Sequence, residues 1–350
     1  MGYRILVAED VSAPLRAFVR RRAGRVAVLA DANPAVVARA RALAARLPGC
    51  LGTIAVPLGE RGKHLGTLAA LTDALLAHGA DRSTLIIGVG GGVANDTFGL
   101  TAALFMRGVP YAHVATTLLA MVDASIGGKV GVDTAAGKNL VGRFSDPVAV
   151  FADVRSLQTL PFREIRAGLA EVLKHAIIAG GEPFESLEIL AAHPFAKWPW
   201  EEVIARSVAI KAAIVRVDRE ERGLRATLNL GHTFAHAYES ASGYRIAHGA
   251  AVALGLRAAG LLALRSGRFT QREHLRVLAL LSLLGMPLAT SVRAEAALGA
   301  MRGDKKRRQN ALRFVLPDAI GRVRYDVRVP EATVRTVLHA MEAPPGDMER

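Results

Sequence analysis

The stretch TLIIGVGGGVAND, residues 84–96, decides the fold expected for this chain. Residues 84–89 are mostly apolar and predict a buried strand, which runs directly into three glycines. We expect a helix from about Asp96 to Phe105. A strand, a glycine turn and a helix N-terminus let backbone N–H groups approach a pyrophosphate with no Cβ in the way. The stretch therefore predicts a nucleotide-binding unit of strands and helices.

The same alternation continues on both sides of this turn. Strands are expected at 2–8, 26–30, 53–56, 110–115, 149–153 and 156–159, and helices at 13–22, 35–47 and 65–78. This order favours an α/β fold with a doubly wound, mainly parallel sheet. After residue 160 the pattern changes to long amphipathic helices with few strands. We therefore expect two domains, an α/β domain at 1–159 and a mostly α-helical domain at 160–350.

Composition excludes several classes of protein. The 350 residues carry a net charge of +14, but 51% of them are hydrophobic, so disorder cannot be the main state. Charged or polar residues interrupt every long apolar run, and we expect no membrane span. The N-terminus lacks the basic flank and longer apolar core of a signal peptide. Cys50 is the single cysteine, so no intrachain disulfide forms and the expected location is cytoplasmic.

The positive charge suits either nucleic acid or a small polyanionic substrate. Eight of the 45 basic residues are lysines, and the other 37 are arginines spread along the chain. A lysine in such a chain marks a place that needs a compact cation. All but Lys197 fall in the motifs described below. Because no basic stripe is interleaved with aromatic residues, we expect no nucleic-acid partner.

A group of chemistry-bearing residues lies in GLRATLNLGHTFAHAYESASGYRIAH, residues 223–248. We expect about four turns of helix that carry Arg225, Asn229, His232, His236 and Glu239. Residues four apart share a helix face, so His232 and His236 have the spacing of metal ligands. A third histidine, His248, follows a turn at Gly243. The alternative that the histidine pair lines a packed face stays open at this point.

Two other stretches carry polar residues where strands are expected to end. Asp31 follows the strand 26–30, where the adenosine ribose of a dinucleotide is commonly held, although an N-cap before Pro34 is the alternative. MVDASIGGKVGVDTAAGKNLVGRF, residues 121–144, predicts a loop or a β-hairpin. Its Asp123, Lys129, Lys138 and Asn139 suit a phosphorylated polyol. A charged surface loop is the alternative.

Together these motifs resemble the 3-dehydroquinate synthase family. The stretches that carry the resemblance are GGGVAND, RGVPYAHVATTLLAMVDASIGGKVGVDTAAGKNLVGRF, LPFREIRAGLAEVLKHAII, LRATLNLGHTFAHAYE, HGAAVALG and DKKRRQNALRFVL, within residues 31–323. The resemblance implies an NAD-binding α/β domain, a helical metal- and substrate-binding domain, and an active site between them. It also implies a homodimer.

The activity implied by the resemblance belongs to the shikimate pathway of aromatic amino acid biosynthesis. The substrate is a phosphorylated seven-carbon keto acid, 3-deoxy-D-arabino-heptulosonate 7-phosphate. It is converted to 3-dehydroquinate with loss of phosphate, so the enzyme is a carbon–oxygen lyase. The implied cofactors are catalytic NAD and a divalent metal, Zn²⁺ or Co²⁺.

The resemblance further implies roles for individual residues. The metal ligands are Glu171, His232 and His248, which makes His236 a substrate-side residue rather than a ligand. The catalytic residues are Asp123, Lys129, Lys174, Lys211, Glu221, Arg225, Asn229 and His236. The substrate-binding residues are Arg107, Lys138, Asn139 and Lys305, with Arg107 reaching the phosphate site of a neighbouring subunit. The NAD-binding residues are Asp31, Asn33, Glu60, Lys63, Gly92, Val93, Ala94, Asn95, Asp96, Thr116, Thr117, Lys129, Lys138, Ser156, Leu157, Gln158 and Thr159.

Four positions depart from the usual family pattern, namely Asn95, Asp133, Ala235 and Ala250. None is a ligand or a substrate lysine, but they leave room for another sugar phosphate cyclase with a different phosphorylated sugar. A metal-dependent polyol or alcohol dehydrogenase is the other alternative. It would share the glycine turn and the histidine ligands, but it would not need the lysines.

Overall fold

The computed structural model describes residues 2–22, 24–305 and 312–343, except for the side chains of residues 304 and 305. The chain forms two compact units. The first, here called the α/β unit, comprises Met1–Ile165 and Trp200–Ala212. The second, the helical unit, comprises Arg166–Pro199 and Ala213–Arg350. The division into domains at 1–159 and 160–350 stays a prediction.

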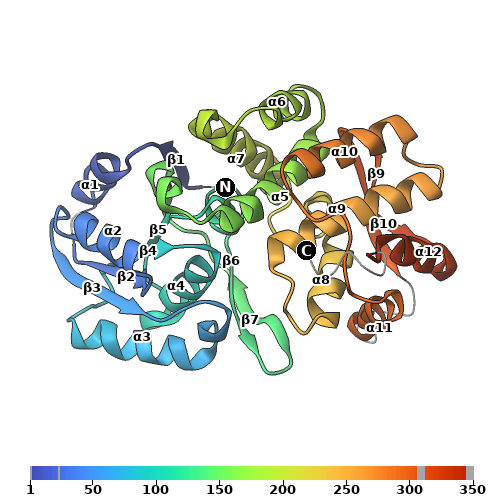
Figure 1. The fold of residues 1–350 in the computed structure, drawn as a ribbon. Coiled ribbons are helices and arrows are strands. Elements are labelled where there is room, and N and C mark those ends of the chain that lie inside the picture. Colours follow the sequence, from blue (N-terminus) through green and yellow to red (C-terminus); the bar gives the residue numbers. More distant parts are fainter. Residues whose placement is uncertain (1, 23, 306–311, 344–350) are drawn as a thin grey trace. The chain divides into compact units, whose positions relative to one another are not determined.

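A six-stranded parallel sheet forms the centre of the α/β unit (Figure 1). In spatial order its strands are β1 (Arg4–Ala8), β8 (Ala149–Asp153), β5 (Tyr111–Ala115), β4 (Leu85–Gly90), β2 (Val26–Asp31) and β3 (Cys50–Val56). Every neighbouring pair is parallel. The predicted parallel α/β sheet is therefore confirmed.

Helices cover both faces of this sheet, because alternate residues of each strand point to opposite sides. In β2, Val26 and Val28 pack with α1 (Ser12–Arg20) and α2 (Pro34–Ala44). Ala27 and Leu29 pack with α3 (Leu65–Ala77) and α4 (Gly92–Leu104) on the other face. The two hydrophobic cores thus make the sheet doubly wound, as predicted.

The strand order places the predicted cofactor residues at one edge of the sheet. From β2 the chain moves outward to β3 and then returns to β4, on the other side of β2. Such a reversal is a topological switch point, and ligands of open α/β sheets bind outside the carboxyl ends of the strands there. Asp31 ends β2 and Gly90 ends β4.

Three local predictions for the α/β unit were wrong in detail. Helix α4 begins at Gly92 rather than near Asp96, because Gly91 serves as its N-cap and the Asn95 amide donates to the Gly91 carbonyl at 3.0 Å. Residues Ala120–Ala124 form a helical turn, η3, instead of a loop. The expected strand at 156–159 belongs to the 3-10 helix η4 (Val154–Thr159). The predicted hairpin is confirmed as β6 (Lys129–Thr134) and β7 (Gly137–Phe144).

The helical unit confirms the predicted change of texture. Its helices are α5 (Phe162–Ala179), α6 (Gly181–Ala191), α8 (His232–Ala241), α9 (His248–Arg265), α10 (Gln271–Leu283), α11 (Ala294–Lys305) and α12 (Glu331–Met341). An antiparallel hairpin, β9 (Arg313–Ala319) and β10 (Arg322–Arg328), accompanies them. Helix α7 (Trp200–Val217) contributes to both units. Short 3-10 turns are η1 (Glu60–Gly62), η2 (Phe105–Arg107), η5 (Phe195–Lys197) and η6 (Leu224–Asn229).

The single four-turn helix expected through Arg225 and His236 was wrong. The 3-10 helix η6 contains Arg225 and ends at Asn229, Gly231 has a left-handed φ of 81°, and α8 begins only at His232. The break has a packing cause, since the Gly231 backbone lies against that of Gly255 in α9. Across the part of the chain that the structure describes, no helix is both long and apolar enough to cross a membrane.

Candidate functional site

Three predicted metal ligands of the helical unit come together. Glu171 lies in the middle of α5 and is 1% exposed, whereas His232 and His248 are the first residues of α8 and α9. The Nε2 atoms of His232 and His248 each lie 3.7 Å from Oε1 of Glu171. One ligand atom from each of the three side chains lies within 4.8 Å of the others.

The close approach of α9 to α5 brings His248 to Glu171. Gly249 follows His248, and any side chain there would overlap Ala167 of α5. Ala167 precedes Glu171 by one helical turn, so the two residues share a face of α5. A glycine beside the histidine therefore lets the two helices approach closely enough for a shared ligand set.

We expect Gly249→Ala to weaken metal binding about tenfold or more, because the added methyl group pushes His248 away from Glu171, an effect comparable to loss of a supporting contact. Competition with a chromogenic chelator would measure the affinity. Gly299→Ala is the matched control: it lies in α11 with open space around its missing Cβ, and it should bind metal normally. Unchanged affinity in the Gly249 variant would contradict the role of this contact.

The second ring nitrogen of each histidine faces an oxygen. Nδ1 of His232 lies 3.2 Å from the Leu230 carbonyl, and Nδ1 of His248 lies 3.4 Å from Oε1 of Glu239. Such contacts leave Nε2 as the nitrogen available to a metal. Glu239 was noted in the sequence without a site role. The sequence signal for a role in the site was its position two turns after His232, on the same helix face. The structure adds that Glu239 is buried, and a buried charge needs a partner.

Burial and charge act differently on the two histidines. Burial, assisted by the nearby Lys174 ammonium, lowers the pKa of His232 to about 3, so its ring is neutral. Burial acts in the same direction on His248, but the carboxylates of Glu171 and Glu239 outweigh it and raise its pKa to about 10. Lys174 itself is buried and forms an ion pair with Glu171.

The other predicted residues of the helical unit lie on η6 and the loop before it. Asn229 donates to the carboxylate of Glu221, whose backbone has a left-handed φ of 59°. The guanidinium of the buried Arg225 donates to the Arg219 carbonyl. His236 is exposed, and its ring centroid lies 5.6 Å from that of His232. These residues thus lie near α8 without joining the three-ligand set.

In the α/β unit, predicted site residues contact one another in two places. Nζ of the buried Lys63 lies 2.6 Å from both Oδ2 of Asp96 and Oδ1 of Asn139. Nζ of Lys138 lies 3.4 Å from Oε2 of Glu60. These contacts join the start of α4 and the segment before α3 to the β6–β7 hairpin. Burial outweighs the Lys63 charge and raises the pKa of Asp96 to about 6.

A second lysine of the α/β unit contacts η3. Nζ of Lys211, on α7, donates to Oδ1 and to the backbone carbonyl of Asp123 at 2.8 and 2.6 Å. Only 6% of Lys211 is exposed. Two residues far apart in sequence, both predicted to be catalytic, therefore form an ion pair in which the lysine is buried.

The glycine turn is flanked by buried polar groups. Asn95 is 1% exposed, and neither polar atom of its carboxamide has a hydrogen-bond partner in the described residues. The hydroxyl of Thr116, 5% exposed, also lacks one there. The Thr116 amide donates to the Gly90 carbonyl at 3.0 Å, which places Thr116 against the turn. Buried polar groups need partners, so this edge of the sheet is suited to a polar ligand.

The N-cap alternative at the end of β2 is confirmed for Asn33, which accepts a hydrogen bond from the Ala35 amide at 3.0 Å. Asp31 accepts from the Asn33 amide at 2.9 Å. Contact of either residue with a cofactor stays a prediction. Lys129 and Arg107 are exposed, on β6 and η2. The Lys305 side chain lies outside the described residues.

Comparison with known proteins identifies the family. The profiles described as 3-dehydroquinate synthase N-terminal and C-terminal match residues 53–167 and 168–307. The 3-dehydroquinate synthase of Gloeobacter violaceus is 43% identical over 322 residues, 89% of each chain. That of Symbiobacterium thermophilum is 40% identical over 97% of each chain. A solved structure of 2-epi-5-epi-valiolone synthase from Streptomyces hygroscopicus, with NAD⁺ and Zn²⁺ bound, is 29% identical over 97% of each chain and has a TM-score of 0.88. The chain belongs to the 3-dehydroquinate synthase family.

Proposed function

We propose that the chain catalyses the 3-dehydroquinate synthase reaction, which converts 3-deoxy-D-arabino-heptulosonate 7-phosphate to 3-dehydroquinate and phosphate. The observation that carries the proposal is the group of Glu171, His232 and His248 in a chain about 40% identical to 3-dehydroquinate synthases along its length. We also propose NAD and Zn²⁺ or Co²⁺ as its cofactors.

The three side chains fit a catalytic divalent metal. Two histidines and one glutamate form a ligand set that leaves a fourth coordination position open. Ligands about 2.1 Å from a tetrahedral ion lie roughly 3.4 Å apart, and the two Nε2 to Oε1 distances are 3.7 Å. A bound ion would polarise an alcohol oxygen and stabilise negative charge that develops on it.

The edge of the sheet fits NAD. The carboxamide of Asn95 and the hydroxyl of Thr116 are buried polar groups that a dinucleotide could partner, and the amides at the start of α4 face the same turn. Bound NAD would accept a hydride from a secondary alcohol and later return it. The proposed contacts are those of the resemblance: Asp31, Asn33, Glu60, Lys63, Gly92–Asp96, Thr116, Thr117, Lys129, Lys138 and Ser156–Thr159.

Lysine and arginine side chains would hold the phosphate and the carboxylate of the substrate, because charge-assisted contacts are the strong ones for such anions. We assign this binding to Arg107, Lys138, Asn139 and Lys305. Chemistry is assigned to Asp123, Lys129, Lys174, Lys211, Glu221, Arg225, Asn229 and His236. The ion pairs of Lys211 with Asp123 and of Lys174 with Glu171 hold the two ammonium groups in fixed directions. The departing phosphate can take up a proton itself, so no dedicated base is required.

Homodimerisation and a cytoplasmic location are also proposed. Arg107 has a left-handed φ of 70° and no partner among the described residues, and the exposed Leu104 and Met106 lie beside it. An exposed arginine held in an unfavourable backbone conformation next to apolar side chains suits contact with a second subunit. The single cysteine suits a reducing compartment.

Another sugar phosphate cyclase remains the alternative, because the departures at Asn95, Asp133, Ala235 and Ala250 could alter substrate choice. The 2-epi-5-epi-valiolone synthase is similar over nearly the whole chain. Its identity of 29% is lower than the 43% shared with the Gloeobacter enzyme, which favours the 3-dehydroquinate synthase reaction.

We expect NAD to be required and returned unreduced. The protein should release phosphate from the seven-carbon substrate while absorbance at the NADH wavelength stays flat, because the hydride is given back within each turnover. Phosphate release and absorbance can be followed in the same reaction. Chelation of the metal should stop phosphate release and added Zn²⁺ or Co²⁺ should restore it. Accumulation of NADH in step with product would instead indicate a dehydrogenase.

A further inference from the structure

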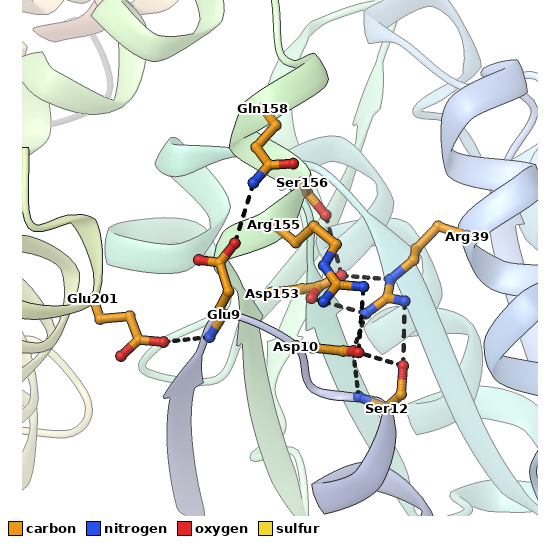
Figure 2. Close-up of polar contacts among 9 residues, drawn as sticks. All are labelled: Glu9, Asp10, Ser12, Arg39, Asp153, Arg155, Ser156, Gln158 and Glu201. Atoms are coloured by element: carbon orange, nitrogen blue, oxygen red, sulfur yellow. Dashed lines mark hydrogen bonds and ion pairs between the residues drawn. The ribbon is translucent and has the colours of Figure 1, made fainter. Parts of the chain in front are cut away.

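A network of charged side chains lies at the carboxyl ends of β1 and β8 in the α/β unit (Figure 2). Arg39 of α2 is its centre. Nε and Nη2 of Arg39 contact the two carboxylate oxygens of Asp153 at 2.6 and 2.9 Å. Nη2 also donates to Asp10 at 2.8 Å, and Nη1 donates to the Ser12 hydroxyl at 3.2 Å. The guanidinium thus joins α2 to the ends of two strands.

The network continues into η4, the segment that carries Ser156–Thr159. The Ser156 hydroxyl donates to Oδ2 of Asp153 at 3.2 Å. Nη1 of Arg155 lies 3.4 Å from Oδ2 of Asp10. The backbone amide of Arg155 donates to the Glu9 carbonyl at 3.0 Å. Nε2 of Gln158 donates to the Glu9 carboxylate at 3.2 Å. Contacts of Arg155, Ser156 and Gln158, whose side chains Figure 2 shows, therefore fix the direction in which η4 leaves β8.

Stability alone is a poor account of the pair of Arg39 and Asp153. Asp153 is completely buried, and 19% of the Arg39 side chain is exposed. The desolvation of such a pair offsets much of its attraction, and apolar residues of similar volume often stabilise a fold as well. What a planar, two-pronged contact provides in addition is a fixed relative orientation.

The pair links two segments with a common proposed role. Arg39 lies in α2, which begins directly after Asp31 and Asn33, and Asp153 directly precedes η4. The two segments come from strands that are not neighbours in the sheet. A shift of one segment against the other would change the width of any site that both line.

We propose that Arg39 and Asp153 are positioning residues for the nicotinamide cofactor. They hold the start of α2 and η4 in the relative placement in which Asp31 and Ser156–Thr159 contact one dinucleotide. The proposal rests on the proposed function, since it presupposes that these segments bind NAD.

The test compares the NAD affinity of two arginine variants. Arg39→Met keeps the apolar stem and removes the guanidinium, and Arg276→Met is the matched control. Arg276, in α10 of the helical unit, contacts both carboxylate oxygens of Glu188 at 2.8 and 2.6 Å. We expect Arg39→Met to raise the Kd for NAD about tenfold or more, since small displacements of binding groups have effects of this size. Arg276→Met should leave this Kd unchanged. Titration calorimetry on the zinc-loaded protein gives both values.

Steady-state kinetics separate positioning from a structural role. At saturating NAD, the kcat of the Arg39 variant should lie within about twofold of wild type, while its KM for NAD rises as the Kd does. If both variants lower the unfolding midpoint and neither changes the Kd for NAD, the network is structural and the proposal is overturned.

Arg39→Lys covers the case in which Arg39→Met does not fold. It retains a positive charge opposite the buried Asp153 but loses the two-pronged contact, and its Kd for NAD should lie between those of wild type and of a full loss. Wild-type affinity in Arg39→Lys, with Arg39→Met unable to fold, overturns the proposal. Wild-type protein that binds no NAD would overturn the proposed function itself, which is a separate result.

Discussion

His248→Ala should lose both its metal and its activity. The variant removes one of three ligands. Loss of a residue that only supports a ligand typically lowers metal affinity ten- to hundredfold, or by about 1.4–2.7 kcal/mol, and the loss here should be larger. Metal analysis of the purified protein measures the content, and phosphate release measures the activity. Zn²⁺ added at a concentration that saturates the wild-type protein should restore neither the metal content nor the activity.

His236→Ala is the matched control for this experiment. His236 lies one turn from His232 on α8, but it is exposed and outside the three-ligand set. We expect the variant to keep its metal and to lose turnover, because its proposed role is on the substrate side. Metal retained in the His248 variant, or lost in the His236 variant, would overturn the ligand assignment.

The second large effect concerns two proposed substrate contacts, the catalytic Lys129 and the phosphate-binding Arg107. Each alanine variant should lower kcat/KM on the order of tenfold or more, since each removes a charge-assisted contact of about 1.5–3 kcal/mol. Lys197→Ala is the control, because Lys197 lies outside the motifs and should behave as wild type. Retention on single-stranded DNA should barely change in any of the three variants.

Mixing the Lys129 and Arg107 variants tests whether Arg107 serves a neighbouring subunit. In a hybrid dimer one site would then contain both groups and the other neither, so part of the activity should return. No recovery after subunit exchange would assign Arg107 to its own chain. If both variants turn over at the wild-type rate and lose salt-sensitive nucleic-acid binding, the proposed phosphate site does not exist.

Much of the α/β unit could be predicted, because its signals are local. The apolar run at 85–90 and the glycines after it mark a buried parallel strand and a turn, and the alternation of strands with helices follows from nearby residues. The start of α4 was misplaced because Gly92 has low helix propensity, whereas the Gly91 N-cap and the hydrogen bond from the Asn95 amide to the Gly91 carbonyl set the boundary.

The ligand set shows where local reasoning ends. Periodicity paired His232 with His236, since four-residue spacing is visible in one segment. The partners found in the structure, Glu171 and His248, belong to other helices, and their approach depends on the contact of Gly249 with Ala167. No local pattern contains that contact, and only the resemblance to a family indicated the ligand set. Arg39 and Asp153, 114 residues apart, lacked even that signal.

The order of the strands also governs how the chain can fold during synthesis on the ribosome. Strand β8 lies between β1 and β5, so β1 has no partner in the sheet until residue 153 has emerged. At 5–20 residues per second this is a delay of roughly 7–30 s after β1 is made. The α/β unit then still waits for Trp200–Ala212, which supplies Glu201 to the Glu9 amide and Lys211 to Asp123. A nascent chain stalled before residue 149 therefore leaves the edge of β5 open to aggregation and to chaperones.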